Sequence, residues 1–121
     1  IDGLHHAEQV TKDIKNSLKH LVPNGFIVMH DCNPASYEAQ LIPRETVAWN
    51  GDVWKAFVGF KIDNKDFRCC VVDTDFGIGV IQNTTYQPEF SLHSTLHWNH
   101  FNENRKQLLN LITWDEFKAT Y

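Results

Sequence analysis

Ile1-Asp2-Gly3-Leu4-His5-His6 and Phe26-Ile27-Val28-Met29-His30-Asp31 are the two stretches that decide the fold of this chain. Each leads from apolar residues to an acidic residue, and a helix-patterned stretch lies between them. This order predicts a strand, a crossover helix and a second strand that runs parallel to the first beside it. The carboxyl ends of neighbouring parallel strands face one crevice, where open α/β sheets bind ligands. We therefore expect Asp2, His5 and Asp31 to line one site.

The stretch between the two strands has the periodicity of an amphipathic helix. Its apolar residues recur at spacings of three and four, and they are Ala7, Val10, Ile14, Leu18 and Leu21. The helix pattern continues to residue 22, where Pro-Asn-Gly stops it and turns the chain. The run over residues 26–29 is apolar without alternation, which predicts a strand buried on both faces.

The middle of the chain predicts a loop and then a helix. Residues 34–50 are aperiodic, and they leave the sheet edge that carries Asp31, so this loop can cover the crevice. Asp52 has the character of an N-cap for a helix whose apolar face begins at Val53 and includes Trp54.

Two further strands and a helical tail complete the pattern. Strands are expected over residues 67–72 and 79–82, and the short link between them permits only an antiparallel pair. Residues 98–112 have helical periodicity. Thr113 and Glu116 then have the spacing of a capping box at the start of a last helical turn.

Composition limits the class of protein. The chain has 121 residues, the size of one domain, with 42% hydrophobic and 21% charged residues, as in folded globular proteins. Its net charge of −4 disfavours nucleic acid or a membrane surface as partners. No apolar run approaches the roughly 20 residues needed to span a bilayer. The chain opens in a strand and without a Met, which indicates a piece of a longer protein.

The cysteine count indicates the redox compartment. Cys32, Cys69 and Cys70 are odd in number and include an adjacent pair, which disfavours a disulfide framework. They therefore predict free thiols in a reducing compartment, the cytoplasm.

Three features of the chain together resemble the C-terminal half of a class I S-adenosylmethionine-dependent methyltransferase. They are IDGLHH at residues 1–6, LVPNGFIVMHD at residues 21–31 and the expected antiparallel strand pair; NGDVWK at residues 50–55 is also similar to that group. The resemblance implies an α/β fold with a partial Rossmann-like sheet: the end of strand 4, then strands 5 and 6 and the antiparallel strand 7, with flanking helices. Residues 1–83 would be the C-terminal half of the methyltransferase domain, and residues 84–121 a C-terminal helical extension on the same domain.

The resemblance also implies a chemistry. Metal-dependent O-methyltransferases of this family hold an ion between an acid at the end of strand 4 and oxygen ligands at the end of strand 5, and a base follows the first acid by three residues. Carried over by position, the resemblance implies that Asp2 and Asp31 are metal ligands and that His5 is the catalytic base. Mg²⁺ suits oxygen donors. The family's third ligand is usually an acid or amide near Asp31. The neighbours here are His30, Cys32 and Asn33, of which only Asn33 is of that kind, and it lies further along the chain; this leaves Mn²⁺, Fe²⁺ or Zn²⁺ open.

The expected reaction is transfer of a methyl group from S-adenosylmethionine to a small hydroxylated substrate. Asp2, Gly3 and Leu4 are expected to contact this cofactor. The family's Gly-rich loop and ribose-binding acid have no counterpart in this chain, so the resemblance implies that the chain is inactive alone.

Other interpretations of the same residues stay open. Asp2 can cap the following helix, and His30 can be a buried core histidine beneath the site. Asp73 and Asp75 have the character of turn residues.

Two other functions stay open as well. A metal-dependent hydrolase can be built from Asp2, His5, His6, His30 and Asp31, although neither HxH nor HExxH occurs. A non-catalytic module can form a homodimer through an exposed sheet edge or the C-terminal helix.

Overall fold

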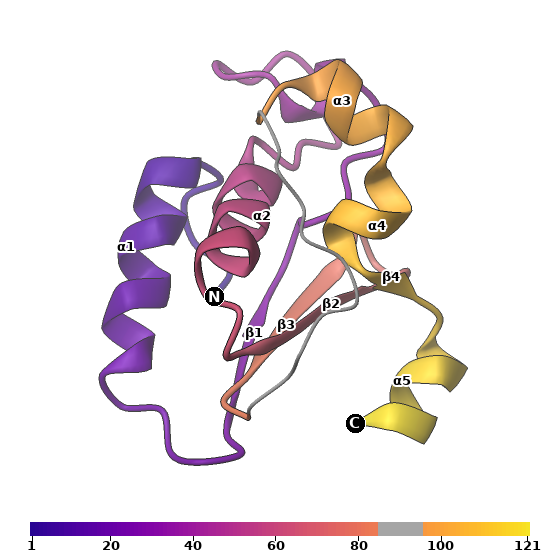
Figure 1. Ribbon diagram of the computed structural model, residues 1–121. Coiled ribbons are helices and arrows are strands. Elements are labelled where there is room, and N and C mark those ends of the chain that lie inside the picture. Colours follow the sequence, from indigo (N-terminus) through magenta and orange to yellow (C-terminus); the bar gives the residue numbers. More distant parts are fainter. Residues whose placement is uncertain (85–95) are drawn as a thin grey trace.

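The computed structural model describes residues 1–84 and 96–121. Its elements are α1 (Ala7–Leu18), β1 (Phe26–Met29), the short 3-10 helix η1 (Glu38–Gln40), α2 (Val53–Asp63), β2 (Arg68–Val72), β3 (Ile78–Gln82), α3 (Trp98–Glu103), α4 (Arg105–Leu109), β4 (Leu111–Ile112) and α5 (Trp114–Thr120) (Figure 1). The expected α/β class is confirmed. Part of the expected extension, residues 85–95, lies outside the described residues.

The sheet has the strand order β1-β3-β2-β4. β3 runs antiparallel to both β1 and β2, so the predicted antiparallel pair is confirmed, and β4 runs parallel to β2. Ile1 lies beside β1: its amine donates to the Val28 carbonyl at 2.6 Å, and the His30 N–H donates to the Ile1 carbonyl at 3.1 Å. This alternation of bonds is the parallel pattern, which is the direction predicted for the first segment.

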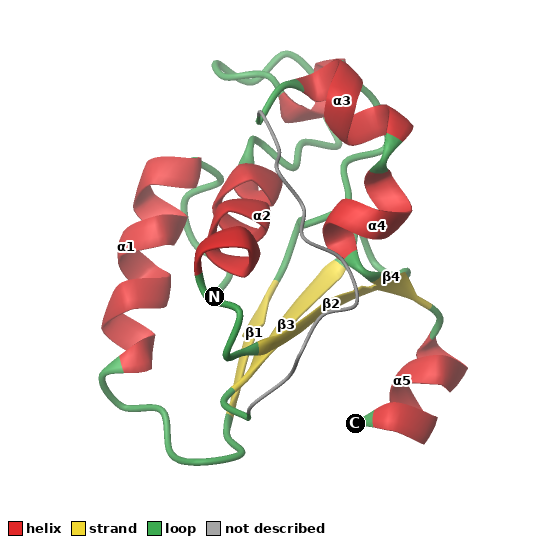
Figure 2. Ribbon diagram, viewed as in Figure 1, coloured by secondary structure: helices red, strands yellow, loops and turns green. Residues whose placement is uncertain are grey.

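Helices cover one face of the sheet, and α5 lies on the other side (Figure 2). The main core joins α1, α2, α3 and α4 to the sheet, and its fully buried side chains include Ile14, Met29, Trp54, Phe57 and Phe101. On the opposite face, Phe117 of α5 packs against a smaller cluster of Cys70, Val72 and Val80. In the described part of the chain, no helix has the length and apolar character needed to cross a membrane.

The prediction that β1 is buried on both faces is wrong. Ile27 and Met29 are 5% and 1% exposed, whereas Phe26 and Val28 are 46% and 50% exposed. The cause is the unequal cover of the sheet, because the helical core lies against the first pair and α5 packs against residues of β2 and β3. The continuous apolar run over residues 26–29 therefore predicted burial of Phe26 and Val28, which no described residues cover fully.

Two predicted helices have different bounds in the structure, and one predicted helix cap is confirmed. α1 ends at Leu18 rather than near residue 22. The predicted helix over residues 98–112 divides into α3 and α4 at Asn104, and it ends at Asn110 in a left-handed conformation (φ 47°), a common helix stop. The chain then enters β4. The capping box of α5 is confirmed by the mutual bonds of Thr113 and Glu116.

Candidate functional site

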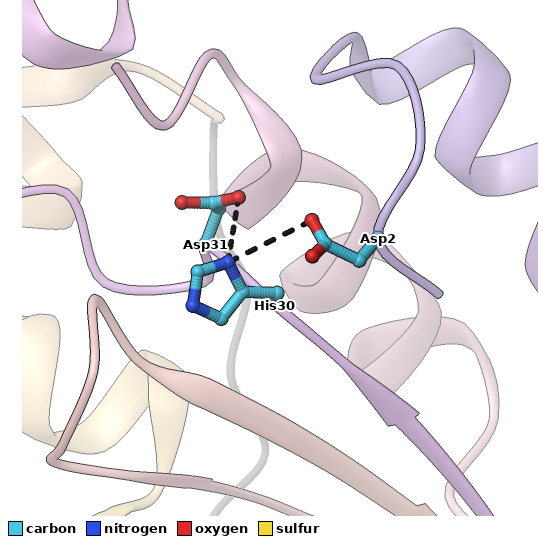
Figure 3. Close-up of side chains that lie close together, drawn as sticks. All are labelled: Asp2, His30 and Asp31. Atoms are coloured by element: carbon cyan, nitrogen blue, oxygen red, sulfur yellow. Dashed lines mark hydrogen bonds and ion pairs between the residues drawn. The ribbon is translucent and has the colours of Figure 1, made fainter. Parts of the chain in front are cut away.

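Two carboxylates that are far apart in the sequence meet at the carboxyl end of β1. Asp2 follows the segment paired with β1, and Asp31 follows β1 itself, after His30. Ligand atoms of Asp2, His30 and Asp31 all lie within 4.8 Å of one another (Figure 3). Asp31 is buried, whereas the Asp2 side chain is 66% exposed. The predicted meeting of Asp2 and Asp31 is therefore found in the structure.

His5 faces both carboxylates. Its Nε2 lies 3.0 Å from Asp31 Oδ2 and 3.7 Å from Asp2 Oδ1. Its Nδ1 lies 2.9 Å from the Trp49 carbonyl oxygen, and the two rings stack with centroids 5.1 Å apart. Because a carbonyl oxygen only accepts, Nδ1 must carry the hydrogen, and Nε2 is the nitrogen presented to the carboxylates.

His30 belongs to the same cluster. Its Nδ1 lies 3.0 Å from Asp31 Oδ2 and 3.7 Å from Asp2 Oδ1, and its Nε2 lies 3.2 Å from Asp75 Oδ2. A quarter of its side chain (24%) is exposed, so the interpretation of His30 as a buried core histidine is wrong. The interpretation of Asp75 as a turn residue was incomplete, because its carboxylate also contacts His30.

Asp31 has an unusual backbone conformation for a residue other than glycine. Its φ is 66°, in the left-handed region, which Asp tolerates better than most residues. Its Oδ1 accepts a hydrogen bond from the Nδ2 of buried Asn50 at 3.3 Å, and its Oδ2 faces both imidazoles. Such conformations gather at functional sites, where the surrounding structure holds them.

The electrostatics of the cluster favour bound protons. Burial raises the pKa of Asp31, against the opposing effect of His5 and His30, and the charge of Asp2 adds to the rise. Burial lowers the pKa of His30, but the charge and hydrogen bond of Asp31, the charge of Asp2 and the hydrogen bond of Asp75 outweigh burial and raise that pKa. A positive charge, carried by a proton or by a cation, is therefore stabilised between these carboxylates.

The turn over residues 49–52, directly before α2, holds the site together. Trp49 bonds to His5, and Asn50 bonds to Asp31. Gly51 has a φ of +64°, and a Cβ there would lie 1.8 Å from the His5 carbonyl oxygen, so only glycine fits. The loop over residues 34–50 therefore ends in contact with the site, in line with its predicted position.

Asp52 caps a different helix from the one predicted. It occupies the position before α2 but makes no side-chain cap bond there. Its Oδ1 instead accepts the Ala7 N–H at 2.6 Å, at the start of α1. Since Asp52 fills this role, the interpretation of Asp2 as the cap of that helix is not supported.

The remaining predicted residues lie around the cluster. Gly3 and Leu4 are exposed between Asp2 and His5. His6 packs its ring against the edge of Trp49, with centroids 6.1 Å apart, and it is not among the mutually close ligand atoms of the cluster.

Sequence reasoning missed three residues of the site. Trp49 and Asn50 fall in the predicted loop, although the resemblance of NGDVWK at residues 50–55 pointed to this stretch. Asp75 gave no signal, because its contact with His30 joins residues 45 positions apart in the sequence.

Two grooves of the described residues lie outside the cluster. Grooves of about 430 and 370 Å³ lie elsewhere among the described residues, one lined by α1 and α2 and the other by residues including Tyr37 and Trp98. Neither groove is lined by Asp2, His5 or Asp31.

The donor set fits a divalent cation. Adjacent ligands of an octahedral ion, each ~2.1 Å from it, lie roughly 3.0 Å apart. The Asp31 oxygen and the His30 nitrogen have this separation, and Asp2 lies 3.7 Å from the same nitrogen.

Comparison with known proteins gives one match. A family model described as "Methyltransferase domain" matches residues 1–32, the stretch that carries Asp2, His5, His30 and Asp31. No curated protein and no solved structure matches the chain. The match supports a methyltransferase domain.

Proposed function

We propose that this chain is the C-terminal half of a class I S-adenosylmethionine-dependent methyltransferase that methylates an oxygen of a small hydroxylated substrate with a divalent metal. The observation that carries the proposal is the meeting of Asp2, His5 and Asp31 at one end of the sheet. The strand order β1-β3-β2, with β3 antiparallel to both neighbours, fits the 5-7-6 order of that family. Ile1 then stands where strand 4 ends.

Asp2 and Asp31 would hold the metal through their carboxylate oxygens. A divalent ion bound there supplies a charge that lowers the pKa of a substrate hydroxyl. The orientation of Asp31 supports this role, since Asn50 holds one of its oxygens and the other faces His5 and His30.

His5 would accept the proton of that hydroxyl. The Trp49 carbonyl keeps the hydrogen on Nδ1, so Nε2 is the atom available to take a proton. If Asp31 held a metal, its Oδ2 would no longer compete for a hydrogen bond with His5 Nε2, which would remain available as the proton acceptor.

The proposal is tested by methyl transfer from isotope-labelled S-adenosylmethionine in the full-length protein that contains this chain. The acceptors are a panel of catechols and sugars, with and without divalent ions. We expect Asp31→Asn to lower kcat by about 100-fold, and His5→Gln to lower it by about 10²–10⁴-fold and to remove the basic limb of the pH profile. The matched control is His20→Gln, on exposed surface beyond α1, which should leave kcat unchanged.

Two results would overturn the proposal. One is a full-length protein that neither binds S-adenosylhomocysteine nor transfers a methyl group to any acceptor. The other is wild-type activity in both Asp31→Asn and His5→Gln.

A further inference from the structure

We propose that His30 is a third, nitrogen ligand of the metal, and that Asp75 is the positioning residue that presents it. The site would then prefer a transition-metal ion such as Mn²⁺, Co²⁺ or Zn²⁺ to Mg²⁺. This inference rests on the proposed metal binding by Asp2 and Asp31, and it does not depend on which substrate is methylated.

The first observation is the position of the His30 ring. Its Nδ1 is the atom that lies within reach of both carboxylates, at 3.0 Å from Asp31 and 3.7 Å from Asp2 (Figure 3). The three ligand atoms are mutually close, which is the condition for binding one ion. His30 and Asp31 are consecutive, and with Asp31 in the left-handed region their side chains contact each other at 3.0 Å.

The second observation is what holds the far side of the ring. His30 Nε2 lies 3.2 Å from Asp75 Oδ2, which places the hydrogen on Nε2 and frees the Nδ1 lone pair when an ion is bound. Histidine ligands of metals nearly always donate their other ring N–H to a carboxylate, carbonyl or water in this way.

The turn between β2 and β3, which carries Asp75, has an unusual backbone conformation. Asp75 and Phe76 are consecutive non-glycine residues with positive φ, 44° and 61°. Phe76 sets its ring edge-on to the His30 ring, with centroids 6.1 Å apart at 84°. Two costly backbone conformations thus bring a carboxylate and an aromatic ring to one imidazole.

The nitrogen donor decides the metal. Mg²⁺ prefers oxygen ligands and binds imidazole weakly. Later first-row ions bind nitrogen more tightly, in the order Mn²⁺ < Fe²⁺ < Co²⁺ with Zn²⁺ also strong. Two carboxylates with one imidazole therefore favour these ions over Mg²⁺.

The test is metal affinity of the full-length protein that contains this chain, measured by calorimetry with Mn²⁺, Co²⁺, Zn²⁺ and Mg²⁺ separately. We expect wild type to bind Co²⁺ and Zn²⁺ at least about tenfold more tightly than Mg²⁺. His30→Asn places an amide oxygen where Nδ1 stood, so we expect it to weaken Co²⁺ and Zn²⁺ by about 10–100-fold and to leave Mg²⁺ within about threefold. Asp75→Asn should weaken Co²⁺ by about tenfold, and the control Asp73→Asn, in the same turn but bonded to Asn33, should not.

A spectroscopic measurement identifies the ligand directly. Pulsed electron paramagnetic resonance of bound Mn²⁺ should show nitrogen hyperfine coupling that is lost in His30→Asn and kept in His5→Gln. Circular dichroism of each variant confirms that it is folded.

Each outcome decides the proposal. Equal affinity for Mg²⁺ and Co²⁺ without nitrogen coupling overturns the role of His30 but leaves Asp2 and Asp31 as an oxygen-only site. Coupling that is lost in His5→Gln instead assigns the nitrogen ligand to His5, and it overturns both His30 as the ligand and His5 as the base. Absence of any metal binding overturns this inference, while methyl transfer by the full-length protein still decides the proposed function separately.

Discussion

Both ends of β1 are flanked by a residue in the left-handed conformation, but the two residues have different roles. Before the strand, Asn24 has a φ of 60°, and after it Asp31 has a φ of 66°. At the first end, backbone groups form hydrogen bonds with one another. The Asn24 N–H donates to the Asn83 carbonyl at 2.8 Å, and the Asn83 N–H donates to the Gly25 carbonyl at 3.0 Å. Asn24 itself is exposed.

At the second end the conformation brings a buried charge into a cluster. Asp31 faces two imidazoles and a second carboxylate, and a buried amide from Asn50 holds it. A left-handed residue in an exposed, self-bonded turn needs no explanation beyond the turn. The same conformation at a buried carboxylate adds strain to desolvation, and this combination distinguishes the site end from the turn end.

The largest expected effect is at the site end. Gly51→Ala would place a Cβ against the His5 backbone at a positive φ, so the His5 segment and the 49–52 turn must move apart. We expect a loss of about 3 kcal/mol or more in the free energy of unfolding, measured by urea titration. The control is Gly3→Ala, whose Cβ would meet nothing within 4 Å, and which should change stability by less than about 0.5 kcal/mol. Equal stability of the two variants would refute the close approach of these segments.

The turn end should respond more weakly. Asn24→Ala puts a residue with poor left-handed preference at φ 60°, and we expect a loss of about 1 kcal/mol. Asn24→Gly should be neutral or slightly stabilising, because glycine adopts this conformation without steric cost. Neither variant should alter metal affinity, and a change in that affinity would show that the two ends are coupled.

The smallest expected effect is a pH dependence of stability in the presence of a chelator. The raised pKa of His30 means that the folded chain binds its proton more tightly than the unfolded chain, whose value is near 6.5. This stabilisation is present below about pH 6.5 and is lost as the pH rises through the higher folded pKa. The raised pKa of Asp31 has the same effect: its stabilisation of the fold is present below about pH 3.8 and is lost as the pH rises through the higher folded pKa.

The size of this effect is limited by exposure. Asp2 and Asp75, which face His30, are 66% and 69% exposed, so solvent screens them. We expect a fall of less than about 1 kcal/mol in unfolding free energy between about pH 6 and about pH 8. His30→Asn should flatten this slope and Asn24→Ala should leave it intact. A rise in stability over the same range would contradict the ion-pair geometry of the cluster.

The features predicted correctly from the sequence depend on local rules. The capping box of α5 involves residues three apart, and the short link before β3 fixes an antiparallel pair. The meeting of Asp2 and Asp31 followed from a longer rule, that a crossover helix brings two strand ends to one edge.

The features that were missed depend on contacts between distant residues. Asp52 bonds to Ala7 across 45 positions, so no local pattern could reveal which helix it caps. The exposure of Phe26 and Val28 depends on what packs over β1, and hydrophobicity alone does not record it. Asp75 resembled any acidic turn residue until the fold placed it against His30.

The 49–52 turn has a mechanical consequence. Four consecutive residues fix the hydrogen on one imidazole, the orientation of Asp31, the approach of the His5 backbone and the first N–H of α1. Because the four residues are consecutive, a displacement of Trp49 from the His5 ring would also pull on the contacts made by its neighbours. In the proposed reaction, the tautomer of His5 and the orientation of Asp31 would therefore change together.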